Sequence, residues 1–154
     1  MWPAPCQLFQ RMGKTFFNTT IKIASTPERV WAALADIERW PEWTPTVSRL
    51  ELLSGLPFGV GSRVRIHQPK LRPAVWEVTR WEAGQGFAWT AKHPGVRAVG
   101  EHIIEAADDG CIVTLKVCFD GPFGSLAGWL AGRLTTRYLT MEAEGLKKKI
   151  DETA

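Results

Sequence analysis

Hydrophobic and polar residues alternate over residues 19–24 and then change to a helical spacing. Ile21 and Ile23 share one face of the alternating stretch, which predicts a half-buried strand. The Ser-Thr-Pro-Glu sequence at 25–28 supplies a cap and a first-turn proline, so it predicts a helix start. Apolar residues then recur every three to four positions. We predict that Pro41 ends this helix, because the residue before a proline is disfavoured in the helical region.

Six further segments of mostly alternating residues follow, with glycine- and proline-containing turns between most of them. Short strands with such turn signals are typical of an antiparallel meander. The predicted strands are Val47–Leu53, Arg63–Gln68, Ala74–Ala83, Phe87–Lys92, Val96–Ala106 and Cys111–Asp120. Residues 125–151 contain no proline and carry an apolar stripe wide enough to cover a sheet. A helix of ~26 residues in this region would be ~39 Å long.

The period of two along each predicted strand separates an inner face from an outer face. In the strand from 96 to 106, Gly100 and His102 fall on the inner face, and Glu101 falls on the opposite one. The other residues predicted to face inward include Trp76, Val78, Phe87, Trp89, Ala91, Val113, Leu115, Val117 and Phe119. The pattern therefore places a histidine among small residues on an otherwise apolar face.

The order of these elements, together with local sequences, resembles the START-like (SRPBCC) superfamily and within it the polyketide cyclase/dehydrase-like group. The matching sequences are Ile21–Trp31, Asp36, Trp40-Pro-Glu-Trp43, Gly61, Gly100-Glu-His102, Asp109-Gly110 and Phe119-Asp-Gly121. The resemblance implies an α+β, helix-grip fold. In this fold a curved antiparallel sheet of about seven strands surrounds a long C-terminal helix, one or two short helices follow the first strand, and a cavity lies between sheet and helix.

The domain prediction is a single START-like domain at 18–152, preceded by an N-terminal arm at 1–17, with Met12 as an alternative start. Members of the superfamily bind lipids and hormones, act as aromatase/cyclases, bind quinones or bind partner proteins. Because one fold serves such different activities, the resemblance predicts the fold and leaves the function open.

Composition and charge narrow the classes of partner. The net charge is +3, both signs are mixed along the chain, and the run of lysines at 147–149 falls where the helix dipole favours cations. We therefore expect no nucleic-acid partner. No uncharged apolar run reaches the ~18 residues of a membrane span, so we expect no transmembrane segment, and residues 1–14 do not have the pattern of a signal peptide. Eight tryptophans suit a wide apolar interior, although core packing would use them too.

The three cysteines, Cys6, Cys111 and Cys118, have no repeated spacing, which predicts no disulfide framework. Cys111 and Cys118 lie in one predicted strand on opposite faces, roughly 23 Å apart, so they cannot bond to each other. We expect a reducing, cytoplasmic location.

Motifs for cofactors, metals and nucleophiles are absent or weak. The Gly-Val-Gly sequence at 59–61 precedes a strand rather than a helix, and the three histidines have no partner at metal-ligand spacing. Ser125 opens a helix, where a capping role is simpler than a nucleophilic one. We expect no cofactor and no metal.

His102 is the strongest catalytic candidate. It is either a hydrogen-bonded core residue or a polar anchor and general acid/base inside the cavity, since histidine exchanges protons near neutral pH. A catalytic role would require a second titratable group beside it. Glu101 cannot serve, because it faces the other side.

The leading hypothesis is a monomer or homodimer that binds a hydrophobic small molecule, such as a lipid, polyketide, aromatic or isoprenoid compound. The ligand-binding candidates are Trp43, Trp76, Phe87, Trp89, His102, Tyr138 and Met141. For Trp43 the alternatives are contact with the pocket or packing, and the Tyr138 hydroxyl either enters the cavity or caps the core. The alternatives are a polyketide cyclase/dehydratase-type enzyme that uses His102, and a module that binds a partner protein.

Overall fold

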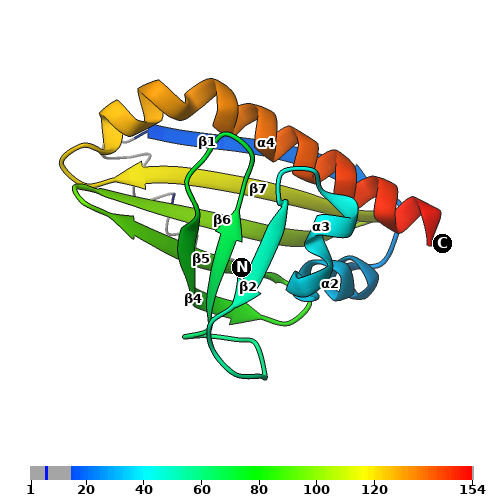
Figure 1. Cartoon of the computed structure of the whole chain (residues 1–154). Coiled ribbons are helices and arrows are strands. Elements are labelled where there is room, and N and C mark those ends of the chain that lie inside the picture. Colours follow the sequence, from blue (N-terminus) through cyan, green and yellow to red (C-terminus); the bar gives the residue numbers. More distant parts are fainter. Residues whose placement is uncertain (1–5, 7–14, 154) are drawn as a thin grey trace.

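The computed structural model describes Cys6 and residues 15–153, and within this part of the chain it shows seven strands, three α-helices and a short 3₁₀ helix (Figure 1). The elements are β1 (Thr15–Ile23), α2 (Pro27–Ala35), the 3₁₀ helix η1 (Ile37–Arg39), α3 (Trp40–Trp43), β2 (Arg49–Leu52), β3 (Arg63–His67), β4 (Ala74–Glu82), β5 (Gly86–His93), β6 (Val96–Ala107), β7 (Gly110–Asp120) and α4 (Gly124–Glu152). The predicted N-terminal arm lies largely outside the described residues.

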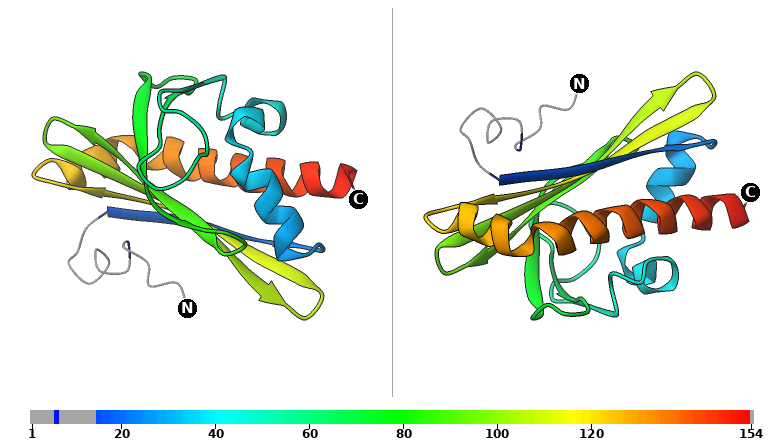
Figure 2. Two further views of the ribbon diagram at one scale, coloured as in Figure 1. Left: turned by 90° about the horizontal axis from the view of Figure 1, so that it is seen from below. Right: turned by 90° about the horizontal axis from the view of Figure 1, so that it is seen from above.

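The strands form one antiparallel sheet in the order β1-β7-β6-β5-β4-β3-β2. The sheet curves, and α4 crosses its concave side at an angle to the strands (Figure 2). Helices α2 and α3 lie near the C-terminal part of α4 (Figure 1). This arrangement confirms the predicted helix-grip fold. No helix in the described part of the chain is long and apolar enough to cross a membrane.

The first helical region differs from the prediction. Helix α2 ends at Ala35, and Asp36 leaves the helical conformation at φ −83° and ψ 70°. Pro41 does not end a helix but lies in the first turn of α3, where its missing N–H costs no hydrogen bond. The resulting turn buries Trp40, whose indole Nε1 donates to the Leu34 carbonyl at 3.0 Å. In addition, β1 begins at Thr15, four residues before the predicted strand.

A register shift in β4 changes which tryptophans face the core. Strands β4 and β5 pair regularly up to Val78 opposite Trp89, and the register then shifts so that Trp81 lies opposite Phe87. A strict period of two would have placed Trp81 with the outward residues. Instead it packs edge-on against Trp31, with ring centroids 4.8 Å apart, and closes the end of the core beneath α2.

The convex side of the sheet carries a second, smaller cluster. Cys6 and Cys118 form a disulfide across 112 residues, and Val99 is buried with them. The expectation that the cysteines form no disulfide is therefore wrong. Sequence spacing did exclude a Cys111–Cys118 bond, but it could not show that residue 6 returns to β7. Because stable disulfides are rare in reducing compartments, the cysteines no longer support a cytoplasmic location.

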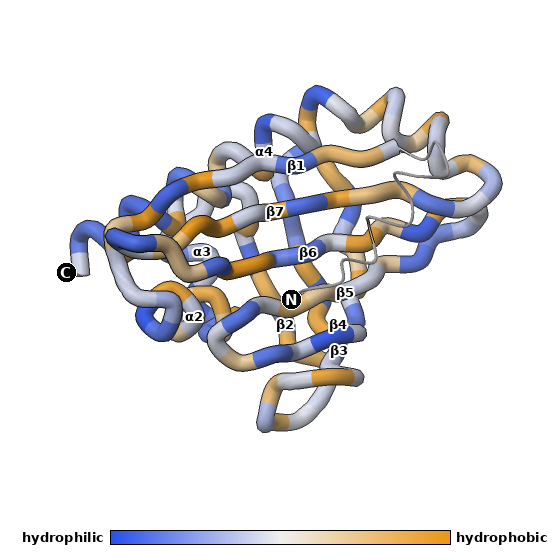
Figure 3. The backbone as a smooth tube through the Cα atoms, turned by 180° about the vertical axis from the view of Figure 1, so that it is seen from behind, coloured by the Kyte–Doolittle hydropathy of each residue, from blue (hydrophilic) through white to orange (hydrophobic). Residues whose placement is uncertain are grey.

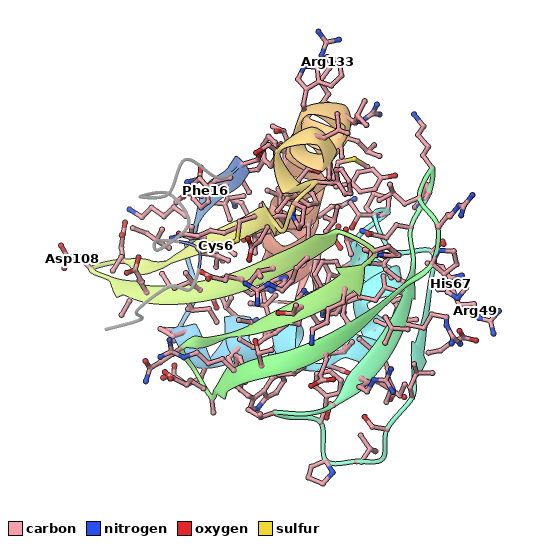
Figure 4. The ribbon with its side chains drawn as sticks, turned by 90° about the vertical axis from the view of Figure 1, so that its left-hand side faces the viewer. Cys6, Phe16, Arg49, His67, Asp108 and Arg133 are labelled. Carbon is pink, nitrogen blue, oxygen red and sulfur yellow. A yellow bond between two sulfur atoms is a disulfide. The ribbon has the colours of Figure 1, made fainter. Side chains whose placement is uncertain are left out.

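The same cluster buries Glu101. This residue faces the convex side, as its position in the strand predicts, yet its side chain is fully buried. Its Oε1 accepts a hydrogen bond from the backbone N–H of Cys6 at 2.9 Å. Segments far apart in the sequence thus meet at Cys6, which Figure 4 shows beside the strands near Phe16.

Candidate ligand-binding site

A cavity of about 320 Å³ lies between the concave side of the sheet and α4. Strands β3 to β7 supply most of its wall, and α4 supplies the side opposite the sheet. The α4 residues that line it are Ala131, Leu134, Thr135, Tyr138, Leu139 and Glu142. These positions recur at three- and four-residue intervals, so one stripe of the helix faces the hollow.

Three tryptophans, two from the sheet and one from α3, form part of the cavity wall. Trp40, Trp76 and Trp89 line the cavity, and the Trp89 ring contacts each of the other two at centroid distances of 5.4 and 5.6 Å. Gly100, in the neighbouring strand, makes room for this group, because a Cβ there would lie 2.7 Å from Trp89 Nε1. The hollow therefore depends on small residues in β6 as much as on the tryptophans.

A buried pair of polar side chains lies among the apolar residues of the wall. His102 Nε2 lies 2.8 Å from Glu142 Oε1, and both residues line the cavity. The two side chains are 7% and 12% exposed, so the pair is largely shielded from solvent. With Glu142 ionised, Nε2 carries the proton and donates it to the carboxylate, and Nδ1 is then the acceptor nitrogen.

Aromatic rings fix the orientation of the imidazole. Phe87 stacks on His102 with centroids 4.3 Å apart and an interplanar angle of 12°. Trp40 and Trp89 contact the same ring at 5.2 and 5.5 Å. His102 Nδ1 is buried and has no hydrogen-bond partner among the described residues. A ligand that enters the cavity therefore meets this pair on the side of the Glu142 carboxylate unless the imidazole moves.

The cavity reaches the surface at the ends of β3 and β5 and beside the middle of α4. Leu71, Arg72 and His93 line it and are exposed. Tyr138 donates its hydroxyl hydrogen to the Pro69 carbonyl, which connects α4 to the β3–β4 turn at this opening. The hydroxyl is thus engaged at the mouth of the cavity rather than near His102.

The structure places the seven predicted ligand-binding residues in two groups. Trp76, Trp89, His102 and Tyr138 line the cavity. The other three, Trp43, Phe87 and Met141, are outside the lining. Trp43 packs behind Trp40 at 5.4 Å, and Phe87 lies under the imidazole as its support.

Sequence analysis missed two residues of the site. Glu142 is not among the residues predicted for the site, although its spacing of four from Tyr138 places both on one face of the helix. Trp40, named above only within the family-like motif, lines the cavity beside His102, with ring centroids 5.2 Å apart. The Tyr138–Glu142 spacing was the available signal for the first of them.

A sequence comparison decides the family. Residues 15–151 match the family described as polyketide cyclase / dehydrase and lipid transport. The chain belongs to this family. An uncharacterized protein of Mycobacterium tuberculosis is 28% identical over 121 residues, which is 71% of each chain.

Solved structures share the fold of this family member at low sequence identity. The di-domain ARO/CYC StfQ from the steffimycin biosynthetic pathway superposes with a TM-score of 0.76 at 11% identity. The match covers 96% of this chain and 54% of StfQ, so the chain spans about half of that protein. A START superfamily protein from Mycobacterium smegmatis gives a TM-score of 0.70 at 16% identity, with 90% and 99% of the two chains covered.

Proposed function

We propose that the protein binds a hydrophobic small molecule in the cavity between the sheet and α4. The observation that carries this proposal is a hollow of about 320 Å³ whose wall is mainly aromatic and aliphatic and contains one buried His102–Glu142 pair. Small-molecule sites usually combine an apolar wall with a few polar groups that orient the ligand. Membership of a family described by cyclisation and lipid transport supports the same class of ligand.

The size and polarity of the cavity indicate the kind of molecule. Its volume lies at the lower end of the ~300–1,000 Å³ range of ligand pockets. A compact ligand with fused rings or one short chain fits this volume better than a whole phospholipid. The polar pair favours a ligand that also carries a hydroxyl or phenol group, which can donate a hydrogen bond to the Glu142 carboxylate.

Intrinsic tryptophan fluorescence tests this proposal directly. Trp40, Trp76 and Trp89 line the cavity, so a bound aromatic or isoprenoid ligand changes their emission. We expect saturable changes in tryptophan emission with a panel that covers fatty acids, isoprenoid quinones and polycyclic phenols. The class that binds most tightly identifies the ligand chemistry.

A pair of variants in one strand separates cavity binding from surface adsorption. Ala98 lines the cavity and is buried, whereas Ala106 faces the same side of β6 but is exposed. Ala98→Leu fills part of the hollow and should weaken binding at least tenfold, while Ala106→Leu should leave it unchanged. Equal affinities in the two variants, or no saturable response from any ligand class, would contradict the proposal.

A second candidate function is acid–base catalysis of a cyclisation or dehydration. The specific observation in its favour is the 2.8 Å contact between His102 Nε2 and Glu142 Oε1, which supplies the second titratable group that such a role requires. In this hypothesis the pair accepts a proton from an acidic C–H next to a carbonyl, or donates one to a leaving hydroxyl.

Turnover of a short poly-β-ketone thioester tests the catalytic hypothesis. Loss of a general acid/base lowers the rate by about 10²–10⁴. We expect His102→Gln and Glu142→Gln each to lower the cyclisation rate by such a factor, while Glu144→Gln, on the exposed side of the same helix, retains it. Wild-type protein that gives no more cyclised product than buffer would refute catalysis but not ligand binding.

A further inference from the structure

The first turns of α4 expose an unusual number of large apolar side chains. Trp129 is 79% exposed and Leu130 is 70% exposed, and Phe123 and Leu126 are also exposed beside them. We call Leu71, Phe123, Leu126, Trp129 and Leu130 the mouth patch. Single exposed apolar residues are common, but contiguous groups mark surfaces that bind a partner, a ligand or a membrane.

The mouth patch adjoins the opening of the cavity. The Phe123 N–H donates to the Gly95 carbonyl at 2.9 Å, and its ring covers Gly95 in the β5–β6 turn. The neighbours of that turn, His93 and Val96, line the cavity. On the helix, Leu130 precedes the lining residue Ala131, and Leu71 itself lines the opening. The exposed apolar surface is therefore continuous with the entrance.

Positive charge is concentrated around the same opening. The segments 68–76, 90–100 and 121–141 contain six of the nineteen lysines and arginines and none of the sixteen acidic residues. The cations are Lys70, Arg72, Lys92, Arg97, Arg133 and Arg137. Arg97 pairs with Asp120, and the ion pairs found among the described residues include none of the other five. The rest of the chain thus carries an excess of acid.

Apolar and basic side chains share one face of the helix. Leu126, Leu130, Arg133 and Arg137 fall within one stripe at the α-helical spacing. Figure 3 shows hydrophobic and hydrophilic residues following one another along this part of α4, and Figure 4 shows Arg133 projecting away from the body of the protein. Exposed Trp, Phe and Leu beside Arg is the composition of surfaces that lie in the headgroup region of a bilayer.

We propose that the mouth patch and its basic rim dock on an anionic lipid bilayer, with the cavity entrance against the membrane. Charge complementarity carries this choice, because anionic headgroups attract the arginines and lysines around the opening and the apolar side chains insert at the headgroup boundary. This inference goes beyond the proposed function, because docking depends on surface residues and not on an occupied cavity. Docking through the mouth patch would place the cavity entrance against the lipid bilayer, in which hydrophobic molecules dissolve.

A second copy of the chain suits this surface less well. A two-fold interface through the mouth patch would bring the same basic residues of both copies together, including Arg133 and Arg137. Like charges that face each other across an interface oppose association. The same charges are favourable against a surface of opposite sign.

Vesicle co-sedimentation of the ligand-free chain, residues 1–154, tests docking. One set of vesicles is pure phosphatidylcholine and the other is an equal mixture of phosphatidylcholine and phosphatidylglycerol. We expect binding to the mixed vesicles only, with strong weakening at high salt because salt screens the attraction. The double variant Arg133→Gln/Arg137→Gln should lose at least about tenfold in affinity, since each basic residue near an anionic surface contributes roughly fivefold.

The apolar contribution has its own matched control. Trp129→Ser/Leu130→Ser should also weaken vesicle binding about tenfold or more. Leu56→Ser/Val60→Ser removes two equally exposed apolar residues from the β2–β3 loop, and Arg63→Gln/Lys148→Gln removes two cations far from the mouth. Both control variants should bind as the wild type does.

The outcomes separate this inference from the ligand proposal. Vesicle binding that resists both mouth variants, or no binding to either vesicle type, overturns the docking surface. A Trp129-dependent dimer in sedimentation equilibrium, without vesicle binding, also overturns it in favour of a second copy. Because ligand titration is carried out without vesicles and sedimentation without ligand, either proposal fails on its own measurement.

Discussion

At the scale of single residues, the site depends on one polar contact held within aromatic rings. His102 is 5% exposed, and its Nε2 has a partner only because Glu142 reaches across from α4. Phe87 supports the imidazole from the other side at 4.3 Å. The pair therefore links β6 to α4 across the cavity, and its loss should be measurable as stability even without a ligand.

We expect Glu142→Leu to destabilise the protein by about 1–3 kcal/mol, because it leaves a buried imidazole nitrogen without a hydrogen bond. Glu142→Gln keeps an acceptor at the same place and should change the free energy of unfolding by less than about 0.5 kcal/mol. Urea unfolding followed by tryptophan emission measures both. Glu144→Leu, exposed on the same helix, is the control and should behave as the wild type. A Glu142→Leu protein as stable as wild type would show that the contact contributes nothing.

Sequence patterns predicted some residues of the site better than others. The alternation in β6 placed His102 and Gly100 on the inner face, and both line the cavity. The alternation in β4 could not place Trp81, because the register shift after Val78 moves that side chain to the other face of the sheet. The spacing of Glu142 from Tyr138 indicated a shared helix face, but a glutamate on a helix is ordinarily solvent-facing, and only the packed sheet shows that this stripe is covered.

At the scale of elements, predicted and observed boundaries agree closely for the six later strands and α4. Each of these elements ends at glycine, proline or a short polar turn, which limits its length locally. The region 27–43 was harder, because its apolar spacing continues through Asp36 into a 3₁₀ turn and a second helix. Burial of Trp40 and Trp43 against the core favours this break over one continuous helix.

Helix α4 approaches α3 closely, and a glycine permits the contact. A Cβ at Gly145 would clash with the backbone carbonyl oxygen of Trp43, whereas a Cβ at Gly132 would meet the ring of Phe17 at 3.1 Å. The neighbour is rigid main chain in the first case and a side chain in the second.

We therefore expect opposite results from two alanine substitutions on α4. Gly145→Ala should lower stability by about 1–3 kcal/mol, because separating α4 from α3 costs more than the ~1 kcal/mol of helix propensity that alanine adds. Gly132→Ala should be neutral or slightly stabilising, since the Phe17 ring needs to move by only a few tenths of an ångström. Thermal unfolding of the two variants distinguishes these effects. A gain in stability for Gly145→Ala would show that α4 can move away without cost.

At the scale of the whole molecule, the topology followed from local pattern and family resemblance, but one long-range covalent contact did not. Cys6 and Cys118 are 112 residues apart, and their Cα atoms lie 6.1 Å apart. Nothing in the spacing of three cysteines identifies the pair. The third cysteine, Cys111, is buried in the concave core, and burial, with a smaller contribution from Glu28, raises the pKa of its thiol.

Reduction of the disulfide should destabilise the protein without unfolding its core. A bond that closes so long a loop restricts the unfolded chain, and such bonds typically contribute about 2–4 kcal/mol. Urea unfolding with and without a reductant measures the difference. Cys6→Ser should match the reduced wild type in both conditions, and Cys111→Ala should keep the response to reductant.

Thiol titration checks the disulfide assignment independently. In urea without reductant, one thiol per chain should react. In the native state none should react, because Cys111 is buried and weakly ionised. Three reactive thiols in the unfolded, unreduced protein would exclude the bond and would leave Glu101 on the convex side without the covalent anchor that holds the Cys6 backbone against it.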